Sequence, residues 1–384
     1  MLLCQSWDME AQNSATTRLD DYIVDILPWA HGHQRKAIRD FVRAIIAQQT
    51  GCQAQLARSF GNQEAAAKRL SRLLHNERLE PRHLADAVLL QALVQLPAHG
   101  PVRLAIDWTI EGHQHLLVVS LIVGRRAVPI YWRAYDGTVL KGRMKRYELA
   151  VIRRALTRVI RKVGPRRVRV TADRGFADVA LFTLLTELRV AFVIRVKKST
   201  KVCIAGVWRK LHTLRFTGNT RRRALGRLLY CAGHPQPLWV TMSRKRDAQG
   251  KWGRWYLVTN RPYTAEQAVA EYAHRPGCEA GFRDAQWWLG FAQARIKQIS
   301  AWSRLFALVA IALLVVVSLA TRLLLRPGTQ ASTLLRRVAS RRRGRCVLSL
   351  VSAMISLLHQ DPGLYDHLVP RLKLKLAGDL ANVS

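Results

Sequence analysis

Three side chains in the stretch Tyr272–Glu279 could act together on a phosphate group. Tyr272, Arg275 and Glu279 are separated by three and then by four residues, and on a helix this spacing puts all three side chains on one face. A phenol, a guanidinium and a carboxylate on one face suit a site that holds a phosphate group beside a metal ion. One triplet is weak evidence alone, so the hypothesis depends on further carboxylates elsewhere in the chain.

Two aspartates in apolar, strand-like segments supply such carboxylates. Asp107 lies within Arg103–Thr109, and Asp173 directly follows Val168–Ala172. An aspartate is disfavoured inside a strand and is costly to bury without a partner. Asp173 could instead cap the turn that begins at Arg174, but this explanation does not serve Asp107, whose strand continues. We therefore predict that the pair binds a metal ion.

Together with Glu279, the two aspartates make a set of three carboxylates. Carboxylate oxygens are the ligands that Mg²⁺ prefers, with water and phosphate oxygens completing the octahedron. Two such ions about 4 Å apart can activate a water or a 3′-hydroxyl and stabilise the leaving oxygen of a phosphoryl displacement. We predict two Mg²⁺ ions at Asp107, Asp173 and Glu279, with Mn²⁺ as a substitute.

The elements around the aspartates predict an α/β fold. Three consecutive strand patterns indicate an antiparallel meander, at 102–110, 115–123 and 127–135. A helix, a strand, a helix and a strand follow, at 145–163, 166–172, 177–188 and 190–196. This order matches a ribonuclease-H-like mixed sheet, in which Asp107 and Asp173 lie on neighbouring central strands.

The remaining segments complete the predicted domain organisation. Residues 1–98 show helical periodicity with basic faces, which favours an N-terminal helical DNA-binding domain over a merely solvated one. Residues 99–325 form the predicted catalytic domain, interrupted at about 197–260 by short strands and basic turns that indicate a β-rich insertion. Residues 326–384 form a basic helical C-terminal region.

The charge balance indicates a polyanionic partner. The chain of 384 residues has 62 Lys and Arg against 25 Asp and Glu, a net charge of +37. Because 49% of its residues are hydrophobic, it is a globular protein with a large positive field and not a disordered basic tail. Double-stranded DNA is the favoured partner. Six scattered cysteines without metal-ligand spacing indicate neither a zinc site nor a disulfide framework.

An uncharged segment at 305–321 could be mistaken for a membrane span. It is at the short limit of the length that crosses a bilayer, and its composition favours a buried core helix, so no membrane partner is expected. The first residues lack the basic and apolar regions of a secretion signal. With the cysteine usage, this favours a cytoplasmic protein, associated with the nucleoid when bound to DNA.

The motifs taken in order resemble the DDE transposases of the insertion sequence 4 family, whose signature is Tyr-Arg-Glu-Lys. The resemblance covers roughly residues 100–325. It rests on Asp107 in its strand, Ala172-Asp173-Arg174-Gly175-Phe176, the β-rich insertion, Leu257-Val-Thr-Asn260, and Tyr272, Arg275 and Glu279 followed by Phe282-Arg283-Asp284.

This resemblance implies a transposase that cuts the ends of its own insertion sequence and joins them to target DNA. Asp107, Asp173 and Glu279 would be its catalytic, metal-binding triad, and Tyr272 and Arg275 would contact the terminal phosphates. It also implies a homodimer on DNA, and an insertion tryptophan that stacks on a flipped base. The possible tryptophans are Trp208, Trp239, Trp252 and Trp255.

The sequence departs from the family pattern in two places. Gln286 occupies the position of the signature lysine, so Arg283 or Lys297 would have to supply that phosphate-binding charge. Pro276-Gly277 falls inside the expected helix, where a proline costs about 3 kcal/mol or more. The helix of Glu279 is therefore predicted to begin near Pro276 or to be kinked there. Asp284 is expected on a helix surface, and Trp287-Trp288 in the core.

These departures leave alternatives open. One is a DNA-binding relative with weakened or lost catalysis, which Gln286 and Pro276-Gly277 suggest. Another is a ribonuclease-H-fold nuclease without strand joining, against which the N-terminal helices and the insertion argue. A membrane protein would require the helix at 305–321 to face lipid.

Overall fold

The structure is a computed structural model of the chain. It describes residues 19–123, 126–216, 220–246, 250, 252–325, 328–339, 341–342, 345–346, 349–361 and 363–364. The predicted absence of a secretion signal concerns residues outside this set, and so does the end of the basic C-terminal region, at 365–384.

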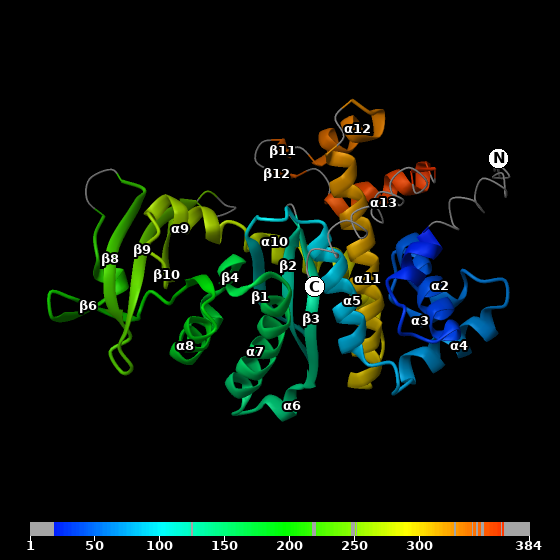
Figure 1. Cartoon of the computed structure of the whole chain (residues 1–384), viewed down its shortest axis with the longest axis horizontal. Helices are drawn as coiled ribbons and strands as arrows, with labels where there is room; N and C mark the ends of the chain where they lie inside the picture. Colours follow the sequence, from blue (N-terminus) through cyan, green and yellow to red (C-terminus); the bar gives the residue numbers. More distant parts are fainter. Residues whose placement is uncertain are drawn as a thin grey trace.

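A ten-stranded mixed sheet runs through the molecule, with helices on both faces (Figure 1). Its strands pair in the order β3-β2-β1-β4-β5-β10-β9-β8-β6-β7. They are β1 (Val102–Glu111), β2 (Gln114–Val123), β3 (Arg126–Asp136), β4 (Val168–Ala172), β5 (Ala191–Arg195), β6 (Lys201–Ile204), β7 (Val207–Lys210), β8 (Arg222–Tyr230), β9 (Gln236–Arg246) and β10 (Trp252–Thr259).

The first five strands form the centre of the fold. The predicted antiparallel meander of β1, β2 and β3 is confirmed, and β4 and β5 add to it in parallel with β1. Parallel neighbours need a crossover connection, which here is made by helices: α6 (Gly137–Leu140) and α7 (Met144–Val163) lead to β4, and α8 (Val179–Glu187) leads to β5. This order is compatible with a ribonuclease-H-like core.

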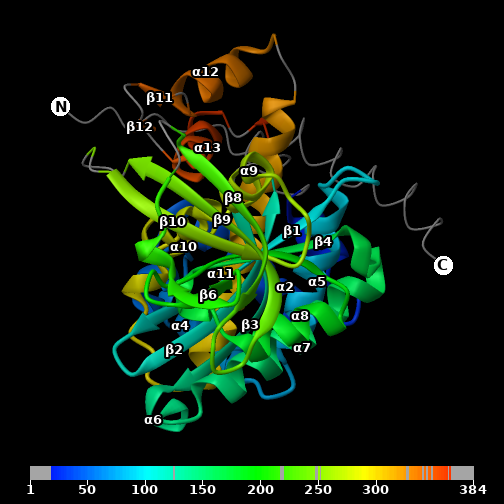
Figure 2. The same cartoon turned by 90° about the vertical axis from the view of Figure 1, so that its left-hand side faces the viewer.

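The insertion extends the same sheet. β10 pairs antiparallel with β5 through Leu257, Val258 and Thr259, and β9, β8, β6 and β7 follow outward. Figure 2 shows these strands in front of the central sheet. The insertion therefore continues the sheet from β5, the strand that pairs with β4.

The long apolar segment forms α11 (Ile299–Leu324), which is buried inside the fold. By length and composition this helix could cross a membrane, but 83% of its most apolar window is buried by the protein itself. The N-terminal helices cover one side of it, and β3 lies on another (Figure 1). These helices are α2 (Gly32–Gln48), α3 (Gln53–Ala57), α4 (Gln63–His75) and α5 (Pro81–Val94).

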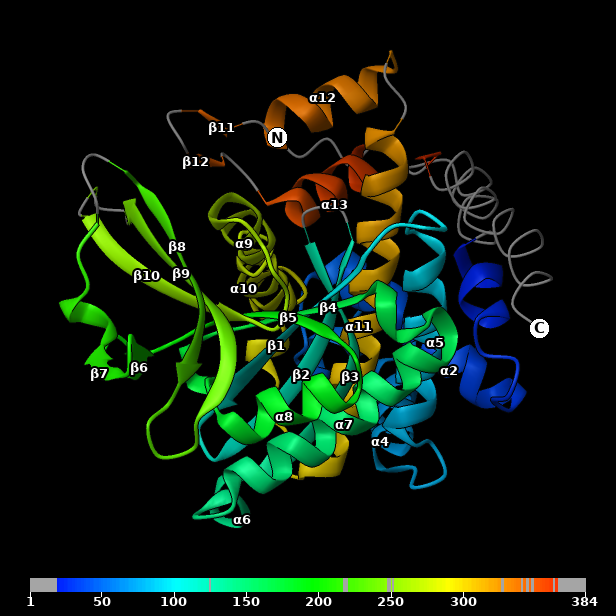
Figure 3. The same cartoon turned by 60° about the vertical axis from the view of Figure 1, so that its left-hand side comes forward.

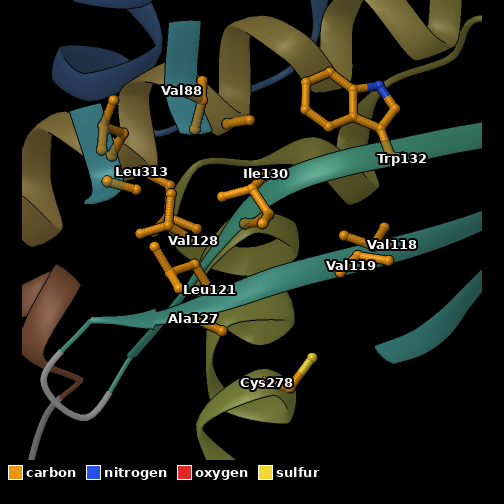
Figure 4. Close-up of a cluster of buried hydrophobic side chains, with 14 of the residues drawn as sticks. Val88, Val118, Val119, Leu121, Ala127, Val128, Ile130, Trp132, Cys278 and Leu313 are labelled. Atoms are coloured by element: carbon orange, nitrogen blue, oxygen red, sulfur yellow. The ribbon is translucent and has the colours of Figure 1, made fainter. Parts of the chain in front are cut away.

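The contact of α5, α11 and β3 is the centre of the hydrophobic core (Figure 4). Val88 from α5, Leu313 from α11, and Val128 and Ile130 from β3 are all almost fully buried there. The N-terminal helices and most of the sheet therefore belong to one continuous core cluster, and a smaller cluster of Val193, Leu257, Ala268 and Tyr272 packs separately.

The segment after the insertion crosses the sheet and ends in further helices. α9 (Ala265–Tyr272) and α10 (Pro276–Arg283) lie between the insertion strands and the C-terminal helices (Figure 3). A five-residue π-helical turn, η4 (Asp284–Trp288), ends α10. Beyond α11 come α12 (Gln330–Ala339), a short hairpin of β11 (Arg341–Arg342) and β12 (Arg345–Cys346), and α13 (Leu350–Gln360).

Candidate active site

Asp107 and Asp173 lie side by side at the centre of the sheet. β1 and β4 are parallel, and their paired positions run from Val102 opposite Val168 to Ile106 opposite Ala172. Asp107 and Asp173 are the next position in this register. Equivalent residues of neighbouring parallel strands point to the same face, with the strands about 4.8 Å apart. The two carboxylates therefore face the same space.

The Asp107 carboxyl lies in a partly buried, electrostatically mixed environment. Burial raises its pKa above the ordinary value, and the negative charge of Asp173 raises it further. The Arg275 guanidinium and the backbone N–H of Trp108, which donates to Asp107 Oδ1 at 3.0 Å, act in the opposite direction. Two carboxylates that repel one another in this way favour a cation between or beside them.

The helix that carries Glu279 begins at Pro276, as the sequence predicted. Pro276 is at its first position, where the missing N–H breaks no helical hydrogen bond. The preceding turn stays compact because Arg275 N–H donates to the Tyr272 carbonyl and Cys278 N–H to the Arg275 carbonyl. The helix is thus divided at Pro276 without a change in chain direction large enough to separate Tyr272, Arg275 and Glu279.

Arg275 joins two of the three predicted carboxylates. Its guanidinium forms an ion pair with Asp107 Oδ2 at 3.0 Å and a second ion pair with Glu279, one helical turn further on. The Arg275 side chain is almost entirely buried, whereas the Glu279 side chain is 53% exposed. A guanidinium therefore occupies the space between the β1 aspartate and the α10 glutamate.

Tyr272 faces the third carboxylate. Its ring is buried against Trp255 of β10 in an edge-to-face contact with ring centres 5.3 Å apart, and the Asp173 charge acts on its hydroxyl. Burial, together with the Asp173 charge, raises the pKa of Tyr272 to about 12. The phenol is therefore a neutral donor at physiological pH.

The donor set suits Mg²⁺, although the present arrangement is not a formed metal centre. Within the described part of the chain, no three His, Cys, Asp or Glu side chains are grouped closely enough to hold one ion. Asp107 and Asp173 offer adjacent hard oxygen ligands on the sheet, and Glu279 is the more exposed member of the set. The carboxylates fit the ion by chemistry, and Arg275 now neutralises two of them.

The residues after Glu279 differ from expectation in two respects. Asp284 is only 1% exposed, because it pairs with Arg126 of β3 at 3.2 Å and accepts a hydrogen bond from Ser349; the prediction of a surface acid was wrong. Burial raises its pKa. Trp288 packs against the core, but Trp287 is 65% exposed, because the π-helical turn shifts the side-chain directions by one residue.

Gln286, at the position of the signature lysine, points back to β1. Its amide donates to Thr109 Oγ1 at 3.2 Å and to Glu111 Oε1 at 2.9 Å. Thr109 and Glu111 lie on the same face of the strand as Asp107, because every second residue of a strand does. Gln286 therefore borders the site without bringing a charge, while Arg283 and Lys297, the predicted substitutes, are exposed.

A buried ion-pair cluster beside the site was not predicted from the sequence. Glu271 accepts hydrogen bonds from Arg103 of β1 and Arg169 of β4, both at 2.8 Å. Arg103 and Arg169 are opposite one another in the strand register, four residues before Asp107 and Asp173, and so lie on the same face. The cluster could have been predicted from the sequence, because an arginine precedes the aspartate by four residues on both strands.

Two of the insertion tryptophans have basic neighbours. Trp255 packs on Tyr272, and the Lys245 ammonium lies 4.1 Å from its ring centre. Trp252 is 48% exposed, with the guanidinium of Arg246 at 4.8 Å from its ring centre. Of these two tryptophans, Trp255 is the one that contacts Tyr272, which in turn lies beside Asp173.

Comparison with known proteins supports the same function class. Residues 141–315 match the family model described as the transposase DDE domain, just under half of the chain. The matched region contains Asp173, Tyr272, Arg275 and Glu279 and begins after Asp107. No curated protein matches the chain. Through this region the chain is similar to the DDE transposases, and the match supports a transposase that acts in DNA transposition.

Proposed function

We propose that the protein is a metal-dependent transposase that cleaves DNA at the ends of its own insertion sequence and transfers the cut strands to target DNA. The observation that carries the proposal is the adjacent position of Asp107 and Asp173 at two central parallel strands, facing Arg275 and Glu279 of the following helix. The insertion sequence 4 branch is supported by the Tyr272, Arg275 and Glu279 spacing.

The chain's own residues would divide the work as follows. Asp107, Asp173 and Glu279 would hold two Mg²⁺ ions, or Mn²⁺ in their place. When bound, such ions supply an activated water or 3′-hydroxyl and stabilise the leaving oxygen. Arg275 presents a guanidinium, which binds phosphate in a bidentate manner. Tyr272, neutral and buried, donates a hydrogen bond from a fixed position.

The experiment is cleavage of a duplex that contains the element's end, with Mg²⁺ and with Mn²⁺. We expect wild type to cut, and Asp173→Asn to lose on the order of 100-fold in rate, because a neutral amide is a poor ligand for Mg²⁺. Asp136→Asn is the matched control: Asp136 also lies at the end of a strand, but it only caps α6, and asparagine caps equally well. Equal rates in wild type and Asp173→Asn would contradict the proposal.

A second candidate is a DNA-binding relative without catalysis. The neutral Gln286 in the signature-lysine position favours it, and so does Arg275, whose guanidinium pairs with both Asp107 and Glu279. In the same assay this protein would retard the duplex but leave it intact with either metal. A nuclease without strand joining would give cut products and no joined ones.

The remaining proposals concern the oligomeric state, the DNA-binding regions and the cellular location. We propose a homodimer that pairs two element ends, with residues 1–98 and the basic C-terminal region as DNA-binding parts of a cytoplasmic protein. The charge of +37 supports binding to DNA. Light scattering with and without an end-containing duplex tests the dimer.

A further inference from the structure

A groove lined by arginines lies along the free edge of the sheet. β3 is the outermost strand at one end of the sheet. The groove lies beside it and is lined by residues of α7 and by the first residues of α5 and α11. Its volume is about 850 Å³. Six arginines line it: Arg82, Arg133, Arg153, Arg154, Arg158 and Arg161.

The positive charge of this groove is only partly neutralised. Glu80 is the one acid among the described residues of its lining, and it pairs with one arginine. Asp86 and Glu187, which lie outside the lining, each pair with one more. The other three arginines form no ion pair with any described residue and are exposed: Arg133, Arg154 and Arg161.

The arginines of α7 form a regular row. The buried face of the helix includes Val151, Ala155 and Val159, whereas Arg154, Arg158 and Arg161 lie on the side that lines the groove. Helix positions three or four apart are about 5–6 Å from one another. Arg158 is also held in place by Asp86, at 2.6 Å, and by the ring of Tyr131. The row therefore places three guanidiniums at regular helical spacing along the groove, with Arg158 fixed at its middle.

The groove is separate from the candidate active site. The Trp108 indole N–H donates to Glu148 of α7, so α7 covers the face of β1 opposite to Asp107. Arg275, Glu279 and the rest of α10 lie on the Asp107 side. The other wall of the groove, with Trp132 and the start of α11, lies on the Asp107 face of the sheet, so a ligand in the groove is separated from the carboxylates by the width of β2 and β3.

We propose that this groove binds the phosphodiester backbone of a second DNA segment, distinct from the one held at Asp107, Asp173 and Glu279. Guanidiniums match phosphate oxygens in a bidentate geometry, and a row of them on a rigid helix follows a backbone without reading bases. The choice of DNA over another polyanion rests on the proposed function. The groove would bind any duplex sequence, with a strong dependence on salt.

The test compares two double charge reversals on the same helix. In the groove variant, Arg154→Glu/Arg161→Glu, neither arginine has an ion pair to lose in the described structure. Binding of a random-sequence duplex that lacks element ends is measured from low to high salt. We expect roughly a tenfold loss of affinity and a slope of log K on log salt that is shallower by about two, since each phosphate contact contributes roughly 0.9.

The control variant is Arg143→Glu/Arg146→Glu, which changes the net charge by the same amount. Both arginines are exposed at the start of α7 and lie outside the groove. The control should lose only about threefold or less in affinity, the part of the effect that comes from net charge alone. Urea unfolding checks that both variants fold as wild type does. The proposal is overturned if the groove variant binds within about twofold of wild type, or if the control weakens binding equally.

The outcome is distinguishable from a failure of the proposed function. The groove variant should still cut a short end-containing duplex while losing strand transfer to a second duplex. Absence of cleavage by wild type would refute the enzyme proposal and leave the groove measurement standing. Undiminished strand transfer by the groove variant would refute the second-segment role.

Discussion

At the residue scale, Arg275 is the side chain on which the candidate site depends. It is buried, and it pairs with Asp107 and Glu279 at once. An arginine in this position serves two opposing purposes. Under the proposed function it would bind phosphate when DNA is present, and it would compete with a metal ion for the same carboxylate oxygens when DNA is absent.

Replacing Arg275 with glutamine should separate these purposes. We expect Arg275→Gln to bind Mn²⁺ about tenfold more tightly, equivalent to the loss of roughly 1.4 kcal/mol of competing ion-pair energy, while cleavage of the end-containing duplex falls. Mn²⁺ titration followed by electron paramagnetic resonance measures the first effect. Arg283→Gln, an exposed change at the end of the same helix, should leave Mn²⁺ binding unaltered. Unchanged Mn²⁺ affinity in Arg275→Gln would show that the guanidinium does not compete with metal.

Glu271 has a different role, because it fixes the end of α9 to the sheet. Burial alone would raise its pKa, but the hydrogen bonds and charges of Arg103 and Arg169 together hold the pKa below the ordinary value. A carboxyl with a lowered pKa in the folded state stabilises the fold above its unfolded pKa, and this stability is lost as the pH falls through the folded pKa.

We therefore expect Glu271→Gln to destabilise the protein by about 2 kcal/mol at pH 7, the range of a hydrogen bond to a charged group. The difference from wild type should begin to shrink below about pH 4, where the carboxyl of the unfolded chain starts to bind a proton, and should be lost as the pH falls through the lowered folded pKa. Urea unfolding at several pH values measures it. A difference that stays constant from neutral pH down to about pH 3 would contradict the assignment of this ion-pair cluster.

At the element scale, α10 is held against β3 by a close contact at Gly281. A Cβ added there would lie 2.6 Å from the Ala127 carbonyl oxygen, which is backbone and cannot move aside. Gly281→Ala should therefore push α10 away from the sheet and cost about 1–3 kcal/mol, as overpacked sites do. Because Glu279 lies on the same helix, close to Gly281, the cleavage rate should fall as well.

The matched control is Gly32→Ala, at the first position of α2, where an added Cβ meets nothing within 4 Å. We expect this variant to be as stable as wild type or slightly more stable. Thermal unfolding of both variants gives the comparison. If Gly281→Ala were as stable as wild type, the backbone of α10 at Gly281 could not lie in close contact with the Ala127 carbonyl of β3.

The elements near the site also show what a sequence can and cannot predict. The meander, α7 and the start of α10 at Pro276 could be predicted, since strand alternation, helical spacing and proline are local signals. The register that puts Asp107 beside Asp173 could not, because no local pattern fixes the pairing of strands that are far apart in sequence. The same holds for Asp284, which is buried through Arg126 and Ser349, both distant in sequence.

At the scale of the whole molecule, two of the described surfaces carry clusters of basic side chains beside aromatic rings or in a groove. The insertion carries basic side chains packed on Trp252 and Trp255, and the free edge of β3 carries the arginine groove. In the sheet order these surfaces lie on opposite sides of β1 and β4. A single sheet thus connects them, with the carboxylates of Asp107 and Asp173 between.

The long helix α11 packs the N-terminal helices and the sheet together. It is buried along nearly its whole length, with α2, α4 and α5 on one side and β3 on another. Leu313, at its middle, is fully buried near Val88 and Val128 (Figure 4). The described N-terminal helices have no separate core: their buried side chains belong to the same cluster as those of the sheet.

We therefore expect Leu313→Ala to destabilise the N-terminal helices and the sheet together, by about 2–5 kcal/mol, the cost of a cavity at a fully buried leucine. Hydrogen exchange in urea, followed separately for α2 and for β1, should show one common transition that moves to lower urea in the variant. Leu325→Ala, just beyond the helix at an exposed position, should leave both unchanged. If α2 lost protection well before β1 in wild type, the helices would be an independent domain resting on the sheet. The connection between the two basic surfaces and the carboxylates would then have to be made by the sheet alone.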